Sequence, residues 1–170
     1  DTLLQPVKAK TPGKRLRFFA YLSARHRPSL GVLAYLAHSG ARVEVYLRDS
    51  SPEVQGNLRR FGVEIHSSPG SLKEALLRSD AIVHHASSSL APEALSLGRP
   101  QVCIPMDIEK RLNAERLQEL GVAYVLSAEH LPKTPPGKNS GQLASGIETF
   151  VRNSLVQEKV GAMAADISLR

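Results

Sequence analysis

Short apolar runs alternate along the chain with longer segments in which apolar residues recur every three or four positions. The short runs are typical of buried strands, and the longer segments are typical of amphipathic helices. The predicted strands span residues 15–22, 42–47, 63–67, 81–85, 100–105 and 122–126. The predicted helices span residues 29–40, 51–62, 71–80, 89–98, 109–121, 141–153 and 155–167.

The regular alternation of strands and helices predicts right-handed crossovers and a parallel sheet with both faces covered. We therefore expect an α/β fold, a Rossmann-like doubly wound sheet of six parallel strands with helices on both faces. Residues 15–170 would form this domain, and residues 1–14 would form a linker. Sheets of this type bind ligands beyond the carboxyl ends of their strands, where helices begin.

Composition narrows the classes of partner and compartment. The formal net charge of +6 favours an anionic partner, but the basic residues are scattered and aromatic residues make up only 5% of the chain. Charge alone therefore makes no choice among nucleic acid, an acidic membrane surface and a phosphorylated small molecule, and a solvated basic surface accounts for it as well. Nucleic acid is not the partner that we expect. A single cysteine, Cys103, excludes an internal disulfide and predicts a cytoplasmic location. No apolar run is long enough to predict a transmembrane segment, and the N-terminus lacks the apolar core of a signal peptide.

The stretch "HHASSS" (84–89) places small polar residues where the fourth predicted strand meets a helix. If Ser89 caps that helix, the N–H groups of the first turn point outward at the positive end of the helix dipole. Serine hydroxyls and the ring of His85 would add further donors. The pattern predicts a phosphate site at this corner, although a polar helix cap followed by an ordinary loop has the same composition.

Residues 83–121 resemble the donor-binding signature of GT-B glycosyltransferases of the UDP-glycosyltransferase type. In "VHHASSSLAPEALSLGRPQVCIPMDIEKRLNAERLQELG", a strand ends in histidine, small residues follow, and the next helix carries Glu-Ala-Leu. Gly-x-Pro, an apolar strand ending in proline and an Asn-Ala helix complete the pattern. The resemblance extends more loosely over 15–170. It implies the C-terminal, nucleotide-sugar-binding half of such an enzyme, with the last helix (154–170) packing on an N-terminal half.

The resemblance also implies a role for each matching residue. Contacts to the donor diphosphate and ribose, to the transferred sugar and to the base fall at the carboxyl ends of predicted strands or in the loops and first helical turns that follow them. The implied residues are Ser23, His85, Ser87, Ser88 and Ser89 for the diphosphate, Glu93 for the ribose, Glu109 and Lys110 for the sugar, and His66, Ser68 and Pro69 for the base loop.

Two departures from the family pattern affect the expected site. Ala86 and Ser87 replace two glycines, so a positive φ in this turn would place strain on a residue with a side chain. Glu109 and Lys110 replace an Asp-Gln pair, so one carboxylate remains and the amide becomes a cation.

The implied function is transfer of a hexosyl group from a UDP- or dTDP-sugar to an acceptor bound by a separate N-terminal domain or subunit. The general base would lie in that half, so we assign no catalytic residue here. We expect no metal, because Asp107 and Glu109 have no histidine at a fitting spacing, and no tightly bound cofactor. The main alternative is a non-catalytic nucleotide-binding or protein-interaction module on the same fold. A nucleotide-sugar 2-epimerase and a nucleic-acid-binding protein are further alternatives.

Overall fold

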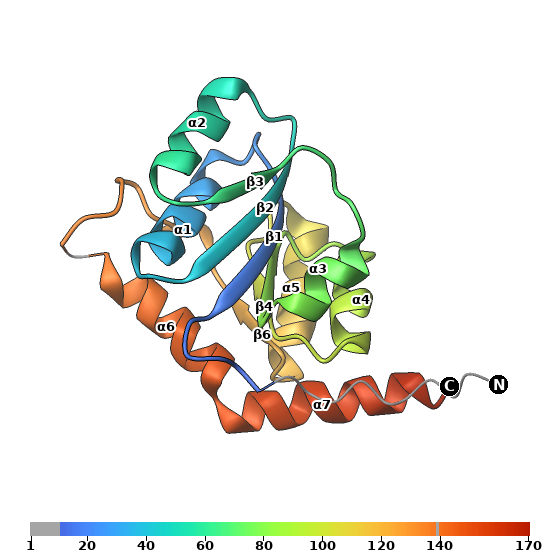
Figure 1. Ribbon diagram of the computed structural model, residues 1–170. Coiled ribbons are helices and arrows are strands. Elements are labelled where there is room, and N and C mark those ends of the chain that lie inside the picture. Colours follow the sequence, from blue (N-terminus) through green and yellow to red (C-terminus); the bar gives the residue numbers. More distant parts are fainter. Residues whose placement is uncertain (1–10, 139) are drawn as a thin grey trace.

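Six parallel strands form one sheet at the centre of the molecule (Figure 1). The computed structural model describes residues 11–138 and 140–170, so most of the predicted linker lies outside the described residues. The strands lie in the order β3-β2-β1-β4-β5-β6, and every neighbouring pair is parallel. Their bounds are β1 (Arg17–Ser23), β2 (Arg42–Arg48), β3 (Glu64–His66), β4 (Ala81–His84), β5 (Gln101–Cys103) and β6 (Ala123–Val125). The predicted doubly wound sheet is confirmed.

Helices cover both faces of this sheet (Figure 1). One face packs against α1 (Arg27–His38), α2 (Pro52–Arg60) and α6 (Gly141–Arg152). The other face packs against α3 (Leu72–Arg78), α4 (Leu90–Ser96) and α5 (Ile108–Glu119). A short 3-10 helix, η1 (Ala128–His130), follows β6, and α7 (Ser154–Ser168) ends the chain. The sequence predicted each α-helix to within a few residues but did not indicate η1.

Side chains of the central strands alternate between the two apolar layers. Phe18 and Leu22 of β1 are buried on the side of α1, α2 and α6, whereas Phe19 of β1 and Ile82 of β4 are buried on the side of α3 and α4. Successive residues of a strand point to opposite faces, so a strand covered on both sides is apolar throughout. This double burial explains why the strands appear in the sequence as continuous apolar runs.

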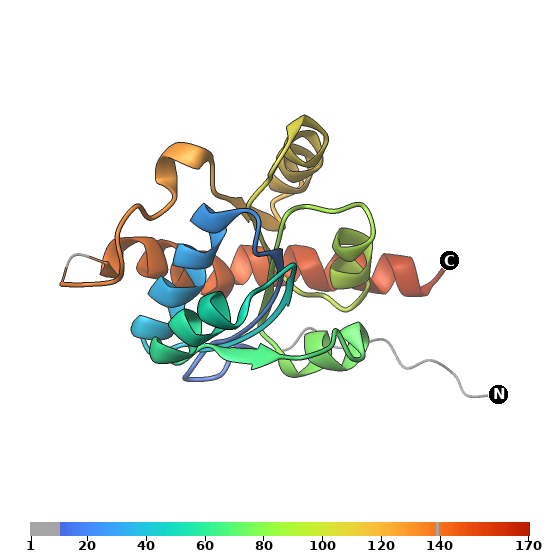
Figure 2. The ribbon, with the colours of Figure 1, turned by 90° about the horizontal axis from the view of Figure 1, so that it is seen from above.

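The final helices cross the molecule from the α1 side to the α4 side (Figure 2). Helix α7 buries Val156, Val160 and Ala164, and it contacts α4. Gly98, just after α4, has a φ of +66° and lies against Val160 and Ala164. The expected packing of the last helix on an N-terminal half stays a prediction. None of the helices in the described part of the chain is both long and apolar enough to cross a bilayer.

Candidate functional site

A cavity of about 440 Å³ opens at the carboxyl ends of the strands, where the strand order reverses between β1 and β4. A reversal of this kind leaves a crevice between loops that diverge in opposite directions, and such crevices bind ligands. Larger cavities lie beside β6, away from this reversal. The cavity wall brings together four residues that the sequence predicted. These residues are His85, Ser87, Ser89 and Lys110.

In the β4–α4 turn, the side chain that caps α4 lies two residues before the predicted one. The Oγ of Ser87 accepts a hydrogen bond from the N–H of Leu90 (3.2 Å), and the Ser87 carbonyl accepts one from Ala91 (3.2 Å). Ser89 already has helical dihedral angles (φ −91°, ψ −39°) and its side chain makes no cap. A capping residue normally stands outside the helical region. The prediction that Ser89 caps this helix is therefore wrong, and Ser87 is the cap.

The next two residues leave their backbone N–H groups without an acceptor in the described part of the chain. These are the N–H groups of Ser88 and Ser89, and both residues are exposed. The hydroxyls of Ser87 and Ser89 lie 3.4 Å apart on the same turn. Helix α4 has only seven residues, so its dipole adds little, and the directed donors are the main attraction for an anion.

His85 is buried, and both of its ring nitrogens are used inside the protein. Its Nδ1 lies 2.8 Å from the carbonyl oxygen of Ile104, so Nδ1 carries the proton and donates it. Its Nε2 accepts from the N–H of Ser23 (3.0 Å). Burial is the main reason that the pKa of His85 falls to about 4, with smaller contributions from neighbouring positive charges, Arg48 and Lys110 among them.

This arrangement corrects the role expected of His85. A neutral ring whose single proton is held by Ile104 neither donates to a phosphate nor adds a positive charge. The residue instead joins the loop after β1 to the loops after β4 and β5. Ser23 is buried as well, and its hydroxyl accepts from the N–H of Arg25 (3.3 Å). His85 thus lines the cavity as a neutral ring, and Ser23 holds that ring from outside the lining.

A second buried network fixes the start of the same turn. The Nε2 of His84 lies 2.7 Å from the Oε1 of Gln101, and its Nδ1 accepts from the N–H of Ala86 (3.1 Å). The Nε2 of Gln101 in turn donates to the carbonyl of Ala91 (3.2 Å). Burial lowers the pKa of His84 to about 4, so the ring is neutral and its Nε2 carries the proton. The sequence pattern did not identify Gln101 as a partner of this turn.

Ala86 has the strained backbone that the missing glycine predicted. Its φ is +65°, in the left-handed region that favours glycine, and its side chain is fully buried. The N–H of Ala86 is held by His84, and its carbonyl accepts from the Nδ2 of Asn113 (3.2 Å). Contacts from two other parts of the chain therefore hold a conformation that an alanine does not favour by itself.

Two cations face the cavity. Arg48 ends β2, and Lys110 lies in the first turn of α5. The Nζ of Lys110 is 2.7 Å from an oxygen of Asp107, and this hydrogen bond is the main reason that the pKa of Asp107 is lowered. No acidic residue is among the described residues that line the cavity. The lining side chains are therefore positive, although Asp107 just outside the wall offsets the charge of Lys110. Sequence reasoning missed Arg48, although its position as the last residue of a strand was a usable signal.

The remaining predicted residues lie around this cavity or away from it. Glu93 is half-buried on α4, and Glu109 is exposed at the start of α5. Ser68 and Pro69 are exposed in the loop between β3 and α3. His66 is the last residue of β3, and its ring lies 6.4 Å from that of Phe19. The binding roles of these residues stay predictions.

Solved glycosyltransferases share this fold. The chain is similar to the calicheamicin glycosyltransferase CalG4 (TM-score 0.71, 23% identity, 98% of this chain and 41% of that one). It is also similar to glycosyltransferase VinC in complex with dTDP (0.66, 19%, 91% and 38%). A third similar structure is Medicago truncatula UGT71G1 complexed with UDP-glucose (0.66, 22%, 93% and 37%).

The chain therefore spans about two fifths of the length of each of these proteins. No protein-family model and no curated protein matches the sequence. The resemblance to GT-B glycosyltransferases is confirmed at the level of the fold.

Proposed function

We propose that this chain is the nucleotide-sugar donor-binding domain of a glycosyltransferase. A UDP- or dTDP-sugar would lie in the cavity between β1 and β4, and its hexosyl group would pass to an acceptor on a separate N-terminal domain or subunit. One observation carries the proposal: Ser89, whose N–H has no acceptor in the described part of the chain, lines the same cavity as the cations Arg48 and Lys110, and Ser88 with a second such N–H precedes it on the same turn. Proteins with the same fold have been solved with dTDP and with UDP-glucose, which supports this class of ligand.

The diphosphate would lie across the β4–α4 turn. The N–H groups of Ser88 and Ser89 and the hydroxyls of the turn would donate to its oxygens, and Arg48 and Lys110 would offset its charge. Negative charge builds on the diphosphate as it leaves the sugar, so fixed donors at this place favour the transition state. His84 and His85 would act only by holding the turn in shape.

The rest of the donor would extend from this anchor. The carboxylate of Glu93 would accept from the ribose hydroxyls, and Glu109 with Lys110 would orient the sugar. The base would lie toward the loop that holds Ser68 and Pro69. The base that activates the acceptor would come from the N-terminal half, and none of these side chains is assigned that task.

A proline at position 88 removes the backbone N–H of that residue and leaves the capping side chain of Ser87 in place. Ser88 lies in the turn before α4, and its N–H donates to nothing in the described chain, so proline there removes no hydrogen bond of the fold. We expect S88P to weaken UDP and dTDP binding about 10- to 100-fold, because one hydrogen bond to a charged group is lost. Isothermal calorimetry on the folded variant measures this change.

The matched control is S88A, which keeps the N–H group and removes only the exposed hydroxyl. We expect S88A to bind both nucleotides more tightly than S88P. Equal affinity of S88P and the unchanged protein would contradict the proposed phosphate site. An absence of binding heat with either nucleotide would favour the non-catalytic module.

A further inference from the structure

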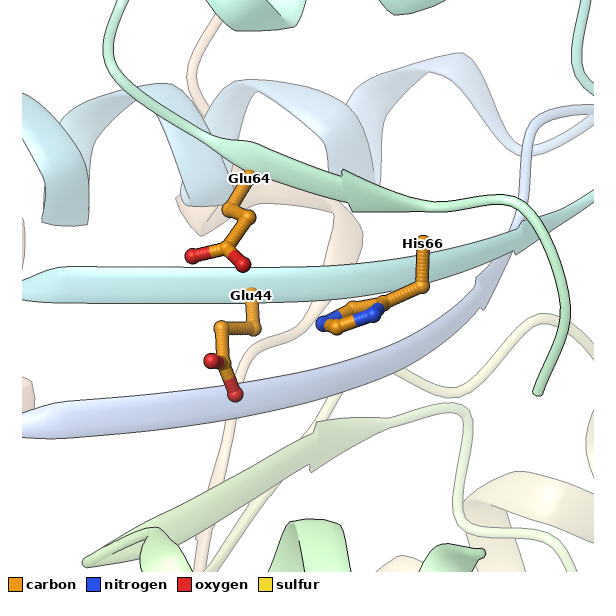
Figure 3. Close-up of side chains that lie close together, drawn as sticks. All are labelled: Glu44, Glu64 and His66. Carbon is orange, nitrogen blue, oxygen red and sulfur yellow. The ribbon is translucent and has the colours of Figure 1, made fainter. Parts of the chain in front are cut away.

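Three potential metal ligands lie together on β2 and β3, on the sheet face that α3 covers (Figure 3). Glu44 and Glu64 are partners in the parallel register, and His66 follows Glu64 by two residues. Side chains two residues apart on a strand point to the same face, so all three side chains project from one side. Their ligand atoms lie within 4.8 Å of one another. None of the three residues lines the cavity assigned above to the diphosphate.

The Nε2 atom of His66 points to a ligand in this cluster. It is buried and has no hydrogen-bond partner in the described part of the chain. Figure 3 shows the outer edge of the ring directed toward the two carboxylates. A buried polar atom without a partner destabilises the fold, and such an atom in a native protein often marks a bound ion or water.

We propose that Glu44, Glu64 and His66 form a binding site for a divalent transition-metal ion, of which Zn²⁺ is the best match. Two carboxylate oxygens and one imidazole nitrogen are ligands that Zn²⁺ prefers, and three protein ligands with one water complete a tetrahedral site. Bonds of about 2 Å bring tetrahedral ligands to about 3.3 Å from one another. The side chains must therefore close inward, and the half-exposed side chain of Glu64 has room to do so.

Two arginines also face the cluster, and they decide how a metal enters. The Nη2 of Arg42 lies 3.3 Å from Glu64 and 3.5 Å from Glu44, so its charge holds both carboxylates. Arg78 lies 3.0 Å from the other oxygen of Glu44. The Arg42 side chain is 45% exposed and can turn into solvent. When Arg42 turns away, the two carboxylates and Arg78 remain. Their net charge of −1 attracts a divalent cation. Arg42 and the metal therefore compete for one place.

Calorimetric titration of Zn²⁺ into the whole chain, in a buffer that does not chelate metals, tests the site. We expect one Zn²⁺ per chain, and a loss of affinity of at least about tenfold in H66N and in E64Q. R42Q should bind Zn²⁺ about two- to fivefold more tightly, because a half-exposed ion pair no longer opposes binding. The visible spectrum of added Co²⁺ should report nitrogen and oxygen ligands in the unchanged protein and lose intensity in H66N.

Two matched variants control for general effects. H38N removes an exposed histidine, and R59Q removes one positive charge from α2. Neither should change Zn²⁺ affinity. Zn²⁺ binding that is unaffected in H66N would overturn the proposal, and so would an absence of binding in both the unchanged protein and R42Q. E64Q should bind UDP as the unchanged protein does, so this site and the proposed diphosphate site can fail separately.

Discussion

Two turns flank the point where the strand order reverses. They differ in which of their backbone N–H groups have hydrogen-bond acceptors. In the turn after β1, Ala24 donates to Arg48, Arg25 donates to the hydroxyl of Ser23, and His26 donates to the Ser23 carbonyl. In the turn after β4, Ser88 and Ser89 donate to nothing in the described chain. Both turns consist of small and polar residues at the carboxyl edge of neighbouring strands.

The comparison shows that composition alone does not identify a turn able to bind an anion. Helix α1 is longer than α4, so it has the larger dipole, but its first turn is closed by Pro28 and by a bond from Ser29 to His26. In the turn before α4, Ser87 and Ser89 line the cavity, and hydrogen bonds to the buried rings of His84 and His85 fix the neighbouring backbone. Although Pro28 and the Ser29–His26 bond close most of the turn before α1, the N–H of Arg27 has no acceptor in the described chain either. The two turns therefore differ in the cavity and the cations beside the turn before α4, and not in helix length.

The largest expected effect comes from enlarging the alanine in each turn. Ala86 and Ala24 are both buried, but only Ala86 has a positive φ. We expect A86V to lower the free energy of unfolding by about 3 kcal/mol, because overpacking and left-handed strain add together. A24V should lower it by about 1–2 kcal/mol less, since only overpacking acts there. Urea denaturation of both variants measures the difference, and equal losses would show that the strain at Ala86 is not significant.

Lowering the pH should reduce the stability of the fold, because the two buried histidines beside the β4–α4 turn are neutral in the folded state. The pKa of His84 and that of His85 are each about 4 in the folded state, against an ordinary value of 6.5. Their contribution to stability is complete above pH 6.5 and is lost as the pH falls toward 4, because the unfolded chain takes up protons first.

Between pH 7 and pH 5.5 we expect the free energy of unfolding to fall by about 2 kcal/mol. Denaturation curves at both pH values test this, and H38N, which removes an exposed histidine, is the control. The turn after β1 has one histidine, His26, whose pKa burial also lowers. A flat profile would contradict the assigned neutral states.

The smallest expected effect separates capping from binding. S87A removes the hydroxyl that accepts from Leu90, and S51A removes the equivalent cap of α2, which accepts from Val54. Each loss should cost about 1 kcal/mol of stability. Only S87A should also weaken nucleotide binding, because only its helix begins at the cavity. A calorimetric titration of both variants with UDP would show this, and equal affinities would place the phosphate elsewhere.

The fold could be predicted from the sequence because it follows from the periodicity of apolar residues and from the residues that begin and end each helix. It also located the turn after β4, and the missing glycine correctly predicted the strain at Ala86. It could not predict the role of His85, because the partners of that ring are 62 and 19 residues away in sequence. Which donors stay free, and which charges such as Arg48 face them, depends on contacts between distant segments that no local pattern encodes.

Helix α4 lies between the cavity and helix α7, which is far from the cavity residues in the sequence. Its first turn borders the cavity, and Gly98 at its other end touches α7. The seven residues of α4 span about 10 Å, so this short helix bridges the cavity and α7. Because the same short helix borders the cavity and packs on α7, a shift of its first turn would alter its packing on the last helix.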